Sequence, residues 1–575
     1  MPYVTNLGNL TDDVLDRIAI DRSAVAFGVK DDDGWHDVTI GEFHAQVQRA
    51  AKGFIAAGVN PGDRVCLLSK TRYEWTVLDY AILWVGGVTV PIYETSSVNQ
   101  IQWILADSEA VACVVETQVH HDKVTSVRAA APSLRNVWSL EANAVTQIKT
   151  LGTGIGDDEV EARRAAVTSD SLATLIYTSG TTGRPKGCML THGNFRFELG
   201  GALDVLGDLF EPDDASTLLF LPLAHVFARV IQVGAIRSGA KLGHTADIVD
   251  LVDHLGEFQP TFILAVPRVF EKIYNSASLS AQADGKGKIF DAATETAIAY
   301  STALDGGKPG IALRLKHKAF DKLVYSKLRA ALGGKATHAI SGGAPLGERL
   351  SHFYRGIGLT VLEGYGLTET TAAVCVNTSD ASRVGTVGKL MPGTEVRVAA
   401  DGELEFRGGQ VQTGYWHNEV ATAEVLDADG WFTTGDLGEV DEDGFVRITG
   451  RKKEILITAS GKNVAPALLE DRMRAHPYVS QALVVGDGKP FIAALVAIDR
   501  EVYTGELDAP ELTEALQKAV DDANTQVSQA ESIRKFVILT EDWTEENGYL
   551  TPSFKVKRNL IMRDFHDEVE TLFTR

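Results

Sequence analysis

The sequence predicts an α/β protein with a large, multi-layer N-terminal domain and a smaller α+β C-terminal domain. Three observations support this prediction: a length of 575 residues, alternating strand-like and helix-like segments in the first part, and a change to short strands and turns beyond about residue 400. A chain of this length exceeds one ordinary core. We expect the boundary near Gly450, with domains of residues 1–450 and 451–575.

The first part of the chain alternates between apolar strands and helices. Strands are expected over residues 63–69, 88–93 and 111–115, with a helix over 74–85. Such β/α alternation is typical of a layered sheet covered by helices.

Between Lys272 and Leu332 the apolar residues follow a helical period. One face of the last predicted helix is apolar, and we expect it to face the core. Its residues are Phe320, Leu323, Val324, Leu328 and Leu332.

The later part of the chain has a different pattern. A strand is expected over 403–406, and the turn 441–444 before Phe445 predicts a hairpin. After Gly450, a helix from Pro466 and apolar strands over 482–485 and 492–498 predict the compact C-terminal unit.

Charge and cysteine content exclude several classes of protein. The formal net charge is -22, from 55 basic and 77 acidic residues, which opposes binding of nucleic acid or anionic lipid through a broad surface. Anionic ligands need local basic clusters, such as Arg451–Lys453 and Lys555–Arg558. The four cysteines form no C-x-x-C pair, so neither a zinc site nor a disulfide framework is indicated.

The sequence shows neither a signal peptide nor an apolar run that could span a membrane. The longest candidate, residues 77–93, is interrupted by Asp79, Gly86, Gly87 and Pro91. We expect a cytoplasmic protein, and leave peripheral membrane contact and oligomerisation open.

A loop rich in Ser, Thr and Gly is the most informative local feature. The strand-like residues 172–177 lead into Thr178-Ser179-Gly180-Thr181-Thr182-Gly183-Arg184-Pro185-Lys186-Gly187. The glycines let backbone N–H groups approach an anion, the hydroxyls add donors, and Lys186 adds a positive charge. These parts suit a polyphosphate. The order of residues is not that of a Walker A loop, which disfavours a P-loop kinase or GTPase.

Five motifs in order resemble the adenylate-forming superfamily of acyl-CoA synthetases, adenylation domains and luciferases. They are 177–187, Tyr365–Thr370, Thr434–Asp436, Gly450–Glu454 and Thr551–Lys555. The segments 91–97 and 266–273 and the helical region 272–332 most resemble long-chain fatty acyl-CoA synthetases. The resemblance implies a small distorted β-barrel within the N-terminal domain. It also implies that the C-terminal domain rotates about a hinge, here Lys453.

The resemblance also implies a two-step reaction and its substrates. A fatty acid carboxylate attacks the α-phosphorus of ATP and releases pyrophosphate, and the thiol of CoA then attacks the acyl-adenylate and releases AMP. Mg²⁺ is the implied metal, with Glu369 as its ligand. Two alternatives stay open: an acyl-AMP ligase that loads a carrier protein, and a CoA ligase for a medium-chain or aryl acid.

The remaining residue roles follow from the same resemblance. Thr178–Lys186 would bind the β- and γ-phosphates and Thr368 the α-phosphate. Lys555 would bridge the carboxylate and the α-phosphate, with Lys557 as the fallback, and His225 would lie beside the carboxylate. The residues expected around adenine and ribose are Gly342, Gly343, Ala344, Glu363, Gly364, Tyr365, Gly366, Asp436 and Arg451.

Overall fold

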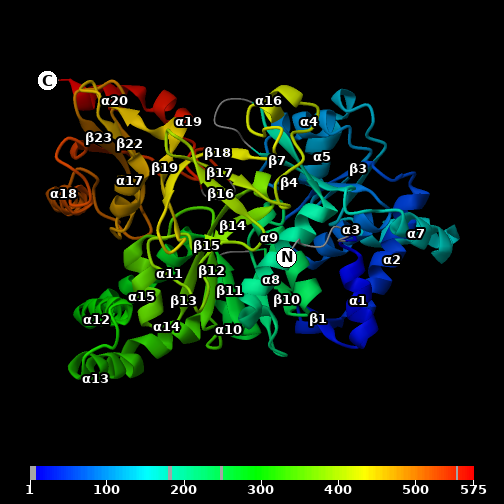
Figure 1. Cartoon of the computed structure of the whole chain (residues 1–575), viewed down its shortest axis with the longest axis horizontal. Coiled ribbons are helices and arrows are strands. Elements are labelled where there is room, and N and C mark those ends of the chain that lie inside the picture. Colours follow the sequence, from blue (N-terminus) through cyan, green and yellow to red (C-terminus); the bar gives the residue numbers. More distant parts are fainter. Residues whose placement is uncertain (1–7, 179–183, 247–249, 552–554, 575) are drawn as a thin grey trace.

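The computed structural model describes residues 8–178, 184–246, 250–551 and 555–574. A smaller C-terminal part packs beside a larger N-terminal part (Figure 1). The mixed α/β architecture confirms the predicted fold class. The loop residues Ser179, Gly180, Thr181, Thr182 and Gly183 lie outside the described residues.

The first large sheet has six strands in the order β6-β5-β3-β4-β7-β8. All neighbours are parallel except β7 and β8, which form an antiparallel pair. The strands are β3 (Arg64–Leu68), β4 (Val88–Ile92), β5 (Ala112–Val115), β6 (Asn136–Ser139), β7 (Leu172–Thr178) and β8 (Lys186–Thr191). The accompanying helices are α2 (Ile40–Ala56), α3 (Tyr73–Trp84), α4 (Val98–Asp107), α5 (Gln118–Ser126), α6 (Ala144–Leu151) and α7 (Asp157–Ala165).

Two further sheets complete the core of the N-terminal part. A four-stranded sheet has the order β2-β1-β10-β9, and a five-stranded sheet has the order β11-β12-β13-β14-β15. The first contains β1 (Val25–Asp31), β2 (Gly34–Thr39), β9 (Ser216–Leu219) and β10 (Lys241–His244). The second contains β11 (Phe262–Ala265), β12 (His338–Ser341), β13 (Thr360–Leu367), β14 (Ala372–Val376) and β15 (Lys389–Leu390).

Long helices connect and cover these sheets. One buried apolar cluster includes side chains from all three sheets, which packs them into a single body. The helices are α1 (Asp12–Asp21), α8 (His192–Phe210), α9 (Val226–Ser238), α10 (Leu251–Phe258), α11 (Pro267–Ala283), α12 (Gly287–Asp305), α13 (Ile311–Phe320), α14 (Ser326–Ala331) and α15 (Glu348–Gly356).

The region of the expected barrel is an antiparallel sheet with the open strand order β16-β17-β18-β19. Its strands are β16 (Glu395–Val398), β17 (Glu403–Arg407), β18 (Phe432–Val440) and β19 (Val446–Arg451). An isolated bridge between Lys389 and Phe445 links it to β15. The short helix α16 (Glu419–Ala423) precedes β18.

The C-terminal part forms its own apolar cores around the sheet β22-β23-β24. Its strands are β20 (Leu456–Ile457), β21 (Asn463–Val464), β22 (Val479–Val485), β23 (Ile492–Ile498) and β24 (Ile533–Ile538). Its helices are α17 (Pro466–Arg474), α18 (Pro510–Asn524), α19 (Arg558–Asp564) and α20 (His566–Phe573). The predicted helix from Pro466 is therefore confirmed.

The apolar face predicted for the helix before Leu332 is only partly correct. Phe320, Val324 and Leu328 pack against the core, but Leu323 is 58% exposed. The physical reason is a π-helical turn, η3 (Asp321–Tyr325), between α13 and α14. A π turn holds more residues than an α turn, so it shifts which side chains share a face.

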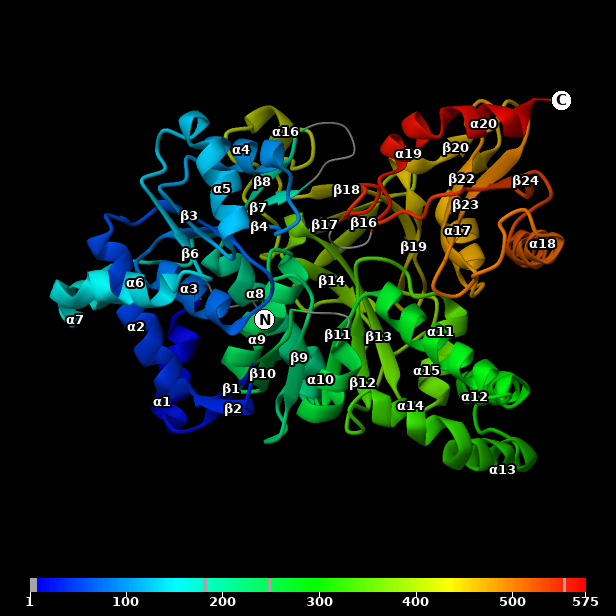
Figure 2. The ribbon, with the colours of Figure 1, turned by 180° about the vertical axis from the view of Figure 1, so that it is seen from behind.

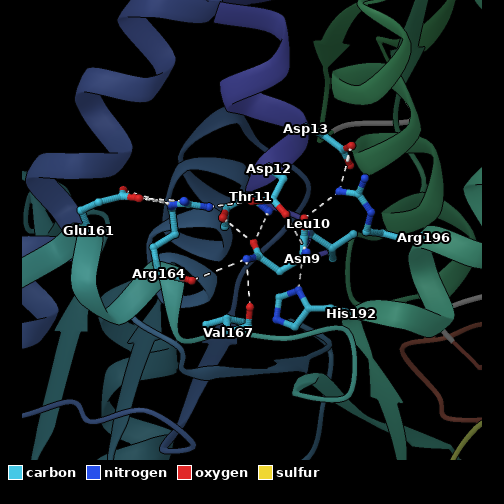
Figure 3. Close-up of polar contacts among 10 residues, drawn as sticks. All are labelled: Asn9, Leu10, Thr11, Asp12, Asp13, Glu161, Arg164, Val167, His192 and Arg196. Atoms are coloured by element: carbon cyan, nitrogen blue, oxygen red, sulfur yellow. Dashed lines mark hydrogen bonds and ion pairs between the residues drawn. The ribbon is translucent and has the colours of Figure 1, made fainter. Parts of the chain in front are cut away.

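The N-terminal segment ties α1 to α8 through polar contacts (Figure 3). The backbone N–H of Leu10 donates to Nδ1 of His192, and Arg196 forms an ion pair with Asp13. On the other side, Arg164 of α7 contacts Asp12. These contacts connect three helices that are distant in sequence. Among the described residues, no helix is long and apolar enough to cross a membrane.

Candidate active site

One cavity of about 720 Å³ collects most of the predicted site residues. Polar side chains of the two parts meet in it, including Lys186 and Thr368 from the N-terminal part and Lys555 from the C-terminal part. Its other walls are apolar. The cavity therefore has the composition of a site for a ligand with one charged end and one hydrophobic end.

The ends of the phosphate loop come from the β7–β8 hairpin. Thr178 and Lys186 are register partners at the open end of the two strands, and both line the cavity. Close packing favours glycine at position 187, because a Cβ there would lie 3.1 Å from the ring of Tyr177. Nε1 of Trp103 donates to the carbonyl of Pro185 over 2.8 Å, which holds one arm of the loop.

A tight turn between β13 and β14 presents Thr368 and Glu369 to the cavity. The hydroxyl of Thr370 accepts a hydrogen bond from the N–H of Leu367 over 2.9 Å. Gly366 permits this turn because a Cβ would lie 1.4 Å from the carbonyl oxygen of Ala372. The backbone therefore requires glycine next to the two polar side chains.

Tyr415 joins the two polar motifs, and sequence reasoning missed it. Its hydroxyl donates to Oε1 of Glu369 over 2.8 Å, and Nζ of Lys186 lies 4.9 Å from its ring centroid. The segment around Tyr415 pairs with β8 through an isolated bridge to Cys188. No nearby motif marks this tyrosine, because only long-range pairing brings it to the site.

The side chains of Asp436, Tyr365 and Arg451 form a connected group. The hydroxyl of Tyr365 donates to Oδ2 of Asp436 over 2.6 Å, and Nε of Arg451 donates to Oδ1 over 2.9 Å. Asp436 and Arg451 are register partners on β18 and β19. Burial and the carboxylate of Asp436 raise the pKa of Tyr365 well above its ordinary value. Tyr365 therefore stays a neutral donor.

Lys555 reaches the cavity from the C-terminal part. Desolvation and the nearby charge of Arg451 lower the pKa of this lysine, while Asp436 and Glu369 act in the opposite direction. Its ammonium group thus lies within the field of both predicted polar motifs. Lys453 also lines the cavity, from the exposed turn that follows β19.

His225 is the N-cap of α9 and lines the same cavity. Its Nδ1 accepts the N–H of Phe227 over 3.3 Å. Burial, with a contribution from Lys555, lowers the pKa of His225 to about 4. The imidazole is therefore neutral near pH 7, and since Nδ1 accepts, Nε2 carries the proton.

Gly342, Gly343 and Gly364 line the cavity, whereas Ala344, Glu363 and Asp436 are not among its lining residues. The carboxylate of Glu363 accepts hydrogen bonds from the N–H of Leu346 and the hydroxyl of Ser351, both over 2.9 Å. Burial raises its pKa. This side chain holds the neighbouring loop in place.

Helices α8 and α9 supply the apolar wall. The lining residues of α8 recur along one side of the helix: Glu198, Leu199, Ala202, Leu203, Leu206 and Phe210. Those of α9 are Val226, Phe227, Val230, Ile231 and Gly234. Glu198 is the exception in this wall. Burial raises its pKa well above the ordinary value, and its Oε1 accepts the N–H of Ala373 over 3.0 Å.

Comparison with protein families decides the classification. The model of the AMP-binding enzyme family matches residues 15–416, and that of the AMP-binding enzyme C-terminal domain matches residues 453–575. The chain belongs to the AMP-binding enzymes. The family resemblance seen in the motifs is thereby confirmed.

Individual relatives in this family cover nearly the whole chain. The long-chain-fatty-acid–CoA ligase FadD15 of Mycobacterium bovis is 52% identical over 559 residues, which are 94% of this chain and 93% of that protein. The human long-chain-fatty-acid–CoA ligase ACSBG1 is 29% identical, over 96% of this chain and 83% of that protein.

Solved AMP-binding enzymes share the fold. The adenylation domain of a carboxylic acid reductase from Segniliparus rugosus, solved with AMP and a co-purified carboxylic acid, matches with a TM-score of 0.77 at 22% identity. The alignment covers 98% of this chain and 94% of that one. MatB from Rhodopseudomonas palustris, solved with ATP, gives 0.74 at 24% identity, over 98% of this chain and 100% of that one.

Proposed function

We propose that the chain is an AMP-forming long-chain fatty acid–CoA ligase, which activates the acid as an acyl-adenylate and then transfers the acyl group to CoA. The observation that carries the proposal is a single cavity that has Lys555, Thr368, Glu369 and Lys186 in its polar part and the apolar side chains of α8 and α9 in its wall. The name of the Mycobacterium bovis relative, a long-chain-fatty-acid–CoA ligase, supports the same substrates.

In the first half-reaction a carboxylate oxygen attacks the α-phosphorus of ATP, and the bond to pyrophosphate breaks. Lys555 lowers the repulsion between the two anions and stabilises the charge that develops between them. Thr368 donates to the α-phosphate, and Thr178 and Lys186 bind the departing pyrophosphate. Neutral His225 donates from Nε2 toward the acyl oxygens, since its Nδ1 is occupied by Phe227.

The ribose and base of ATP lie against the connected group of Asp436, Tyr365 and Arg451. Each carboxylate oxygen has two acceptor sites, so Asp436 retains acceptor capacity for ribose hydroxyls beside its bonds to Tyr365 and Arg451. Those bonds fix the carboxylate before the nucleotide binds. The flat ring of Tyr365 offers the contact surface for adenine.

Mg²⁺ fits the residues present as a phosphate-bound ion rather than as a resident metal. Oε2 of Glu369 has no hydrogen bond to the described residues, whereas Oε1 is held by Tyr415. The described part of the chain contains no group of three or more His, Cys, Asp and Glu side chains that could hold a metal. One carboxylate with phosphate and water oxygens is a usual Mg²⁺ site, and the ion would neutralise phosphate charge.

In the second half-reaction the sulfur of CoA attacks the acyl carbonyl, and AMP leaves. Lys555 has then finished its task, so the C-terminal domain (residues 451–575) turns relative to residues 1–450 about Lys453. Support for this hinge comes from its position. Lys453 lies in an exposed turn directly after the last strand of the antiparallel sheet.

The apolar wall favours a long acyl chain. The lining residues of α8 extend from Glu198 to Phe210, across a kink at Leu206, and the rise of an α-helix between these two positions is about 18 Å. Each methylene that leaves water for this wall contributes about 0.8 kcal/mol. Affinity should therefore rise with chain length until the channel is filled.

The test is acid-dependent AMP formation with acetate, a benzoate and saturated acids of increasing length, with and without CoA. We expect a clear preference for long chains and an acyl-CoA product only when CoA is present. A preference for acetate or benzoate would refute the long-chain assignment. Transfer of the acyl group to the thiol of a carrier protein but not to CoA, with release of AMP, would instead identify a carrier-loading ligase.

A further inference from the structure

The helix α13 has an outward face that the rest of the described chain leaves uncovered. Ile311 and Leu315 are 77% and 66% exposed, and no residue of this helix is fully buried. Both views place α13 at the outer edge of the molecule, beyond α12 (Figures 1 and 2). Of the fifteen large hydrophobic residues that are exposed in the described part of the chain, five lie on α12, on α13 or in η3: Ile289, Leu304, Ile311, Leu315 and Leu323.

The inner face of α13 explains why the helix is held in this position. His317 bonds the carbonyl of Gly356 through Nε2 over 2.6 Å and stacks on Tyr300, with ring centroids 3.9 Å apart. Phe320 packs against the core. At about 100° per residue these side chains share one side, so Ile311 and Leu315 point away from the protein.

Basic residues border this apolar strip on both sides. Helical geometry places Arg314 and Lys318 along one edge and Lys316 along the other. These three side chains and Lys322 are in no ion pair with the described residues. Residues 308–335 contain eight Lys and Arg but one acidic residue, in a chain of net charge -22. The local charge is thus opposite in sign to that of the whole protein.

We propose that this surface, Ile311, Leu315 and the basic residues Arg314, Lys316, Lys318 and Lys322, docks the protein on an anionic lipid bilayer. Apolar side chains between flanking lysines match a helix lying in a membrane interface, where Lys stems cover apolar surface and the ammonium groups reach lipid phosphates. The inference goes beyond the proposed function and does not depend on it.

Other occupants fit less well. A symmetric dimer through α13 would place two basic surfaces against each other, because an isologous contact uses the same patch twice. An acidic protein would satisfy the charges. An acidic partner would leave the apolar strip unexplained, because a protruding helix offers no groove in which a protein could bury it.

The experiment is co-sedimentation of the full chain with vesicles of phosphatidylcholine alone or with phosphatidylglycerol added. We expect binding only to the anionic vesicles, weakened by high salt. Two double variants should each lower partitioning by about tenfold or more: Lys316→Gln with Lys318→Gln, and Ile311→Ser with Leu315→Ser. The matched controls, Ile20→Ser with Val420→Ser and the single change Lys518→Gln, alter residues of similar exposure elsewhere and should bind like the parent.

Fatty-acid-dependent AMP formation is measured on the same preparations without vesicles. This activity tests folding and the proposed function independently of vesicle binding. Variants that keep this activity but lose vesicle binding support the docking surface. The proposal is overturned if neutral vesicles bind equally well, or if the α13 variants bind like the controls. Retention on immobilised polyglutamate without vesicle binding would point to an acidic protein and would also overturn it.

Discussion

Lys555 shows how the fold gives one residue its chemical setting. Its sequence neighbours supply no carboxylate close by, yet Asp436, Glu369 and Arg451 all act on its charge. Their effects on the pKa of the lysine oppose each other, and desolvation lowers it further. The pKa of the lysine that we propose to bridge the two reacting anions is therefore tuned by groups more than a hundred positions away.

We predict that Lys555→Ala lowers acid-dependent ATP–pyrophosphate exchange by about 10²- to 10³-fold, as expected when one group that stabilises transition-state charge is removed. The measurement is isotope exchange at saturating ATP and fatty acid. Lys557→Ala is the matched control and should retain most of the activity. If Lys557→Ala abolished exchange and Lys555→Ala did not, the role would pass to Lys557.

Asp13 provides a residue-scale prediction for pH. Burial, opposed by Arg196 and Arg237, raises its pKa from 3.8 to about 6. Between these values the folded protein binds a proton that the unfolded chain does not, so the contribution of Asp13 to stability falls as pH rises through about 6. Asp13→Asn removes this dependence. Relative to the parent, the variant should gain about 2 kcal/mol between pH 4.5 and 7.5.

The free energy of unfolding in urea at these two pH values measures the effect. Asp21→Asn is a control at the last residue of the same helix, where hydrogen bonds from Ser23 lower the pKa of the carboxyl group. The free energy of unfolding of Asp21→Asn, relative to the parent, should not increase between pH 4.5 and 7.5 as that of Asp13→Asn does. If the free energies of unfolding of Asp13→Asn and the parent differed by the same amount at both pH values, the raised pKa of Asp13 would be contradicted.

At the scale of elements, the position of α9 depends on a buried ion pair with α3. Arg229 of α9 contacts Asp79 of α3, and the two side chains are 1% and 0% exposed. Gln232 and Thr89 also donate to this carboxylate, over 3.1 and 2.7 Å. Since α9 carries His225 at its N-cap and part of the apolar wall, the network orients the apolar end of the cavity.

We predict that Asp79→Asn destabilises the protein by about 3–5 kcal/mol, because it leaves the guanidinium of Arg229 buried without its countercharge. Chemical denaturation measures the change. The control is Glu514→Gln, which removes the carboxylate of an exposed pair with Lys518 and should have little effect. If Asp79→Asn and Glu514→Gln lowered the free energy of unfolding by similar amounts, burial would not explain how much each ion pair contributes to stability.

At the scale of the whole molecule, the proposed reaction requires the two parts both to close on the site and to separate. The structure has Lys555 inside the shared cavity, which suits the first half-reaction. The parts also meet through Arg268 and Asp499, whose charged atoms are 3.8 Å apart, and through the carbonyl of Ala475, which accepts from Arg349. Such sparse polar contacts suit an interface that reforms in another orientation.

We predict that Lys453→Pro uncouples the two half-reactions. The ring fixes φ near −65° and restricts the turn, so pyrophosphate exchange should persist while thioester formation falls at least tenfold. Both steps are measured on one preparation, exchange without CoA and acyl-CoA production with it. Lys453→Ala should retain both steps. Parallel loss of both activities in Lys453→Pro would argue against a hinge there.

Much of this protein was predictable from local sequence. The β/α alternation predicted β3, α3, β4 and β5 within one or two residues, because alternating apolar runs and turn residues act over short distances. The motifs predicted the cavity residues Lys186, Thr368 and Lys555. The π turn at 321–325 was not predictable from the period of apolar residues, and it moved Leu323 to the surface.

By itself the sequence determined the family, the order of the motifs and the chemical types of the reacting groups, since these depend on which residues follow one another. Only the tertiary structure decided that Tyr415 holds Glu369, that Glu363 braces a loop, and that Glu198 lies in an apolar wall. The physical reason is the same in each case. Partners far apart in the chain, and the burial that shifts a pKa, exist only once the layers have packed together.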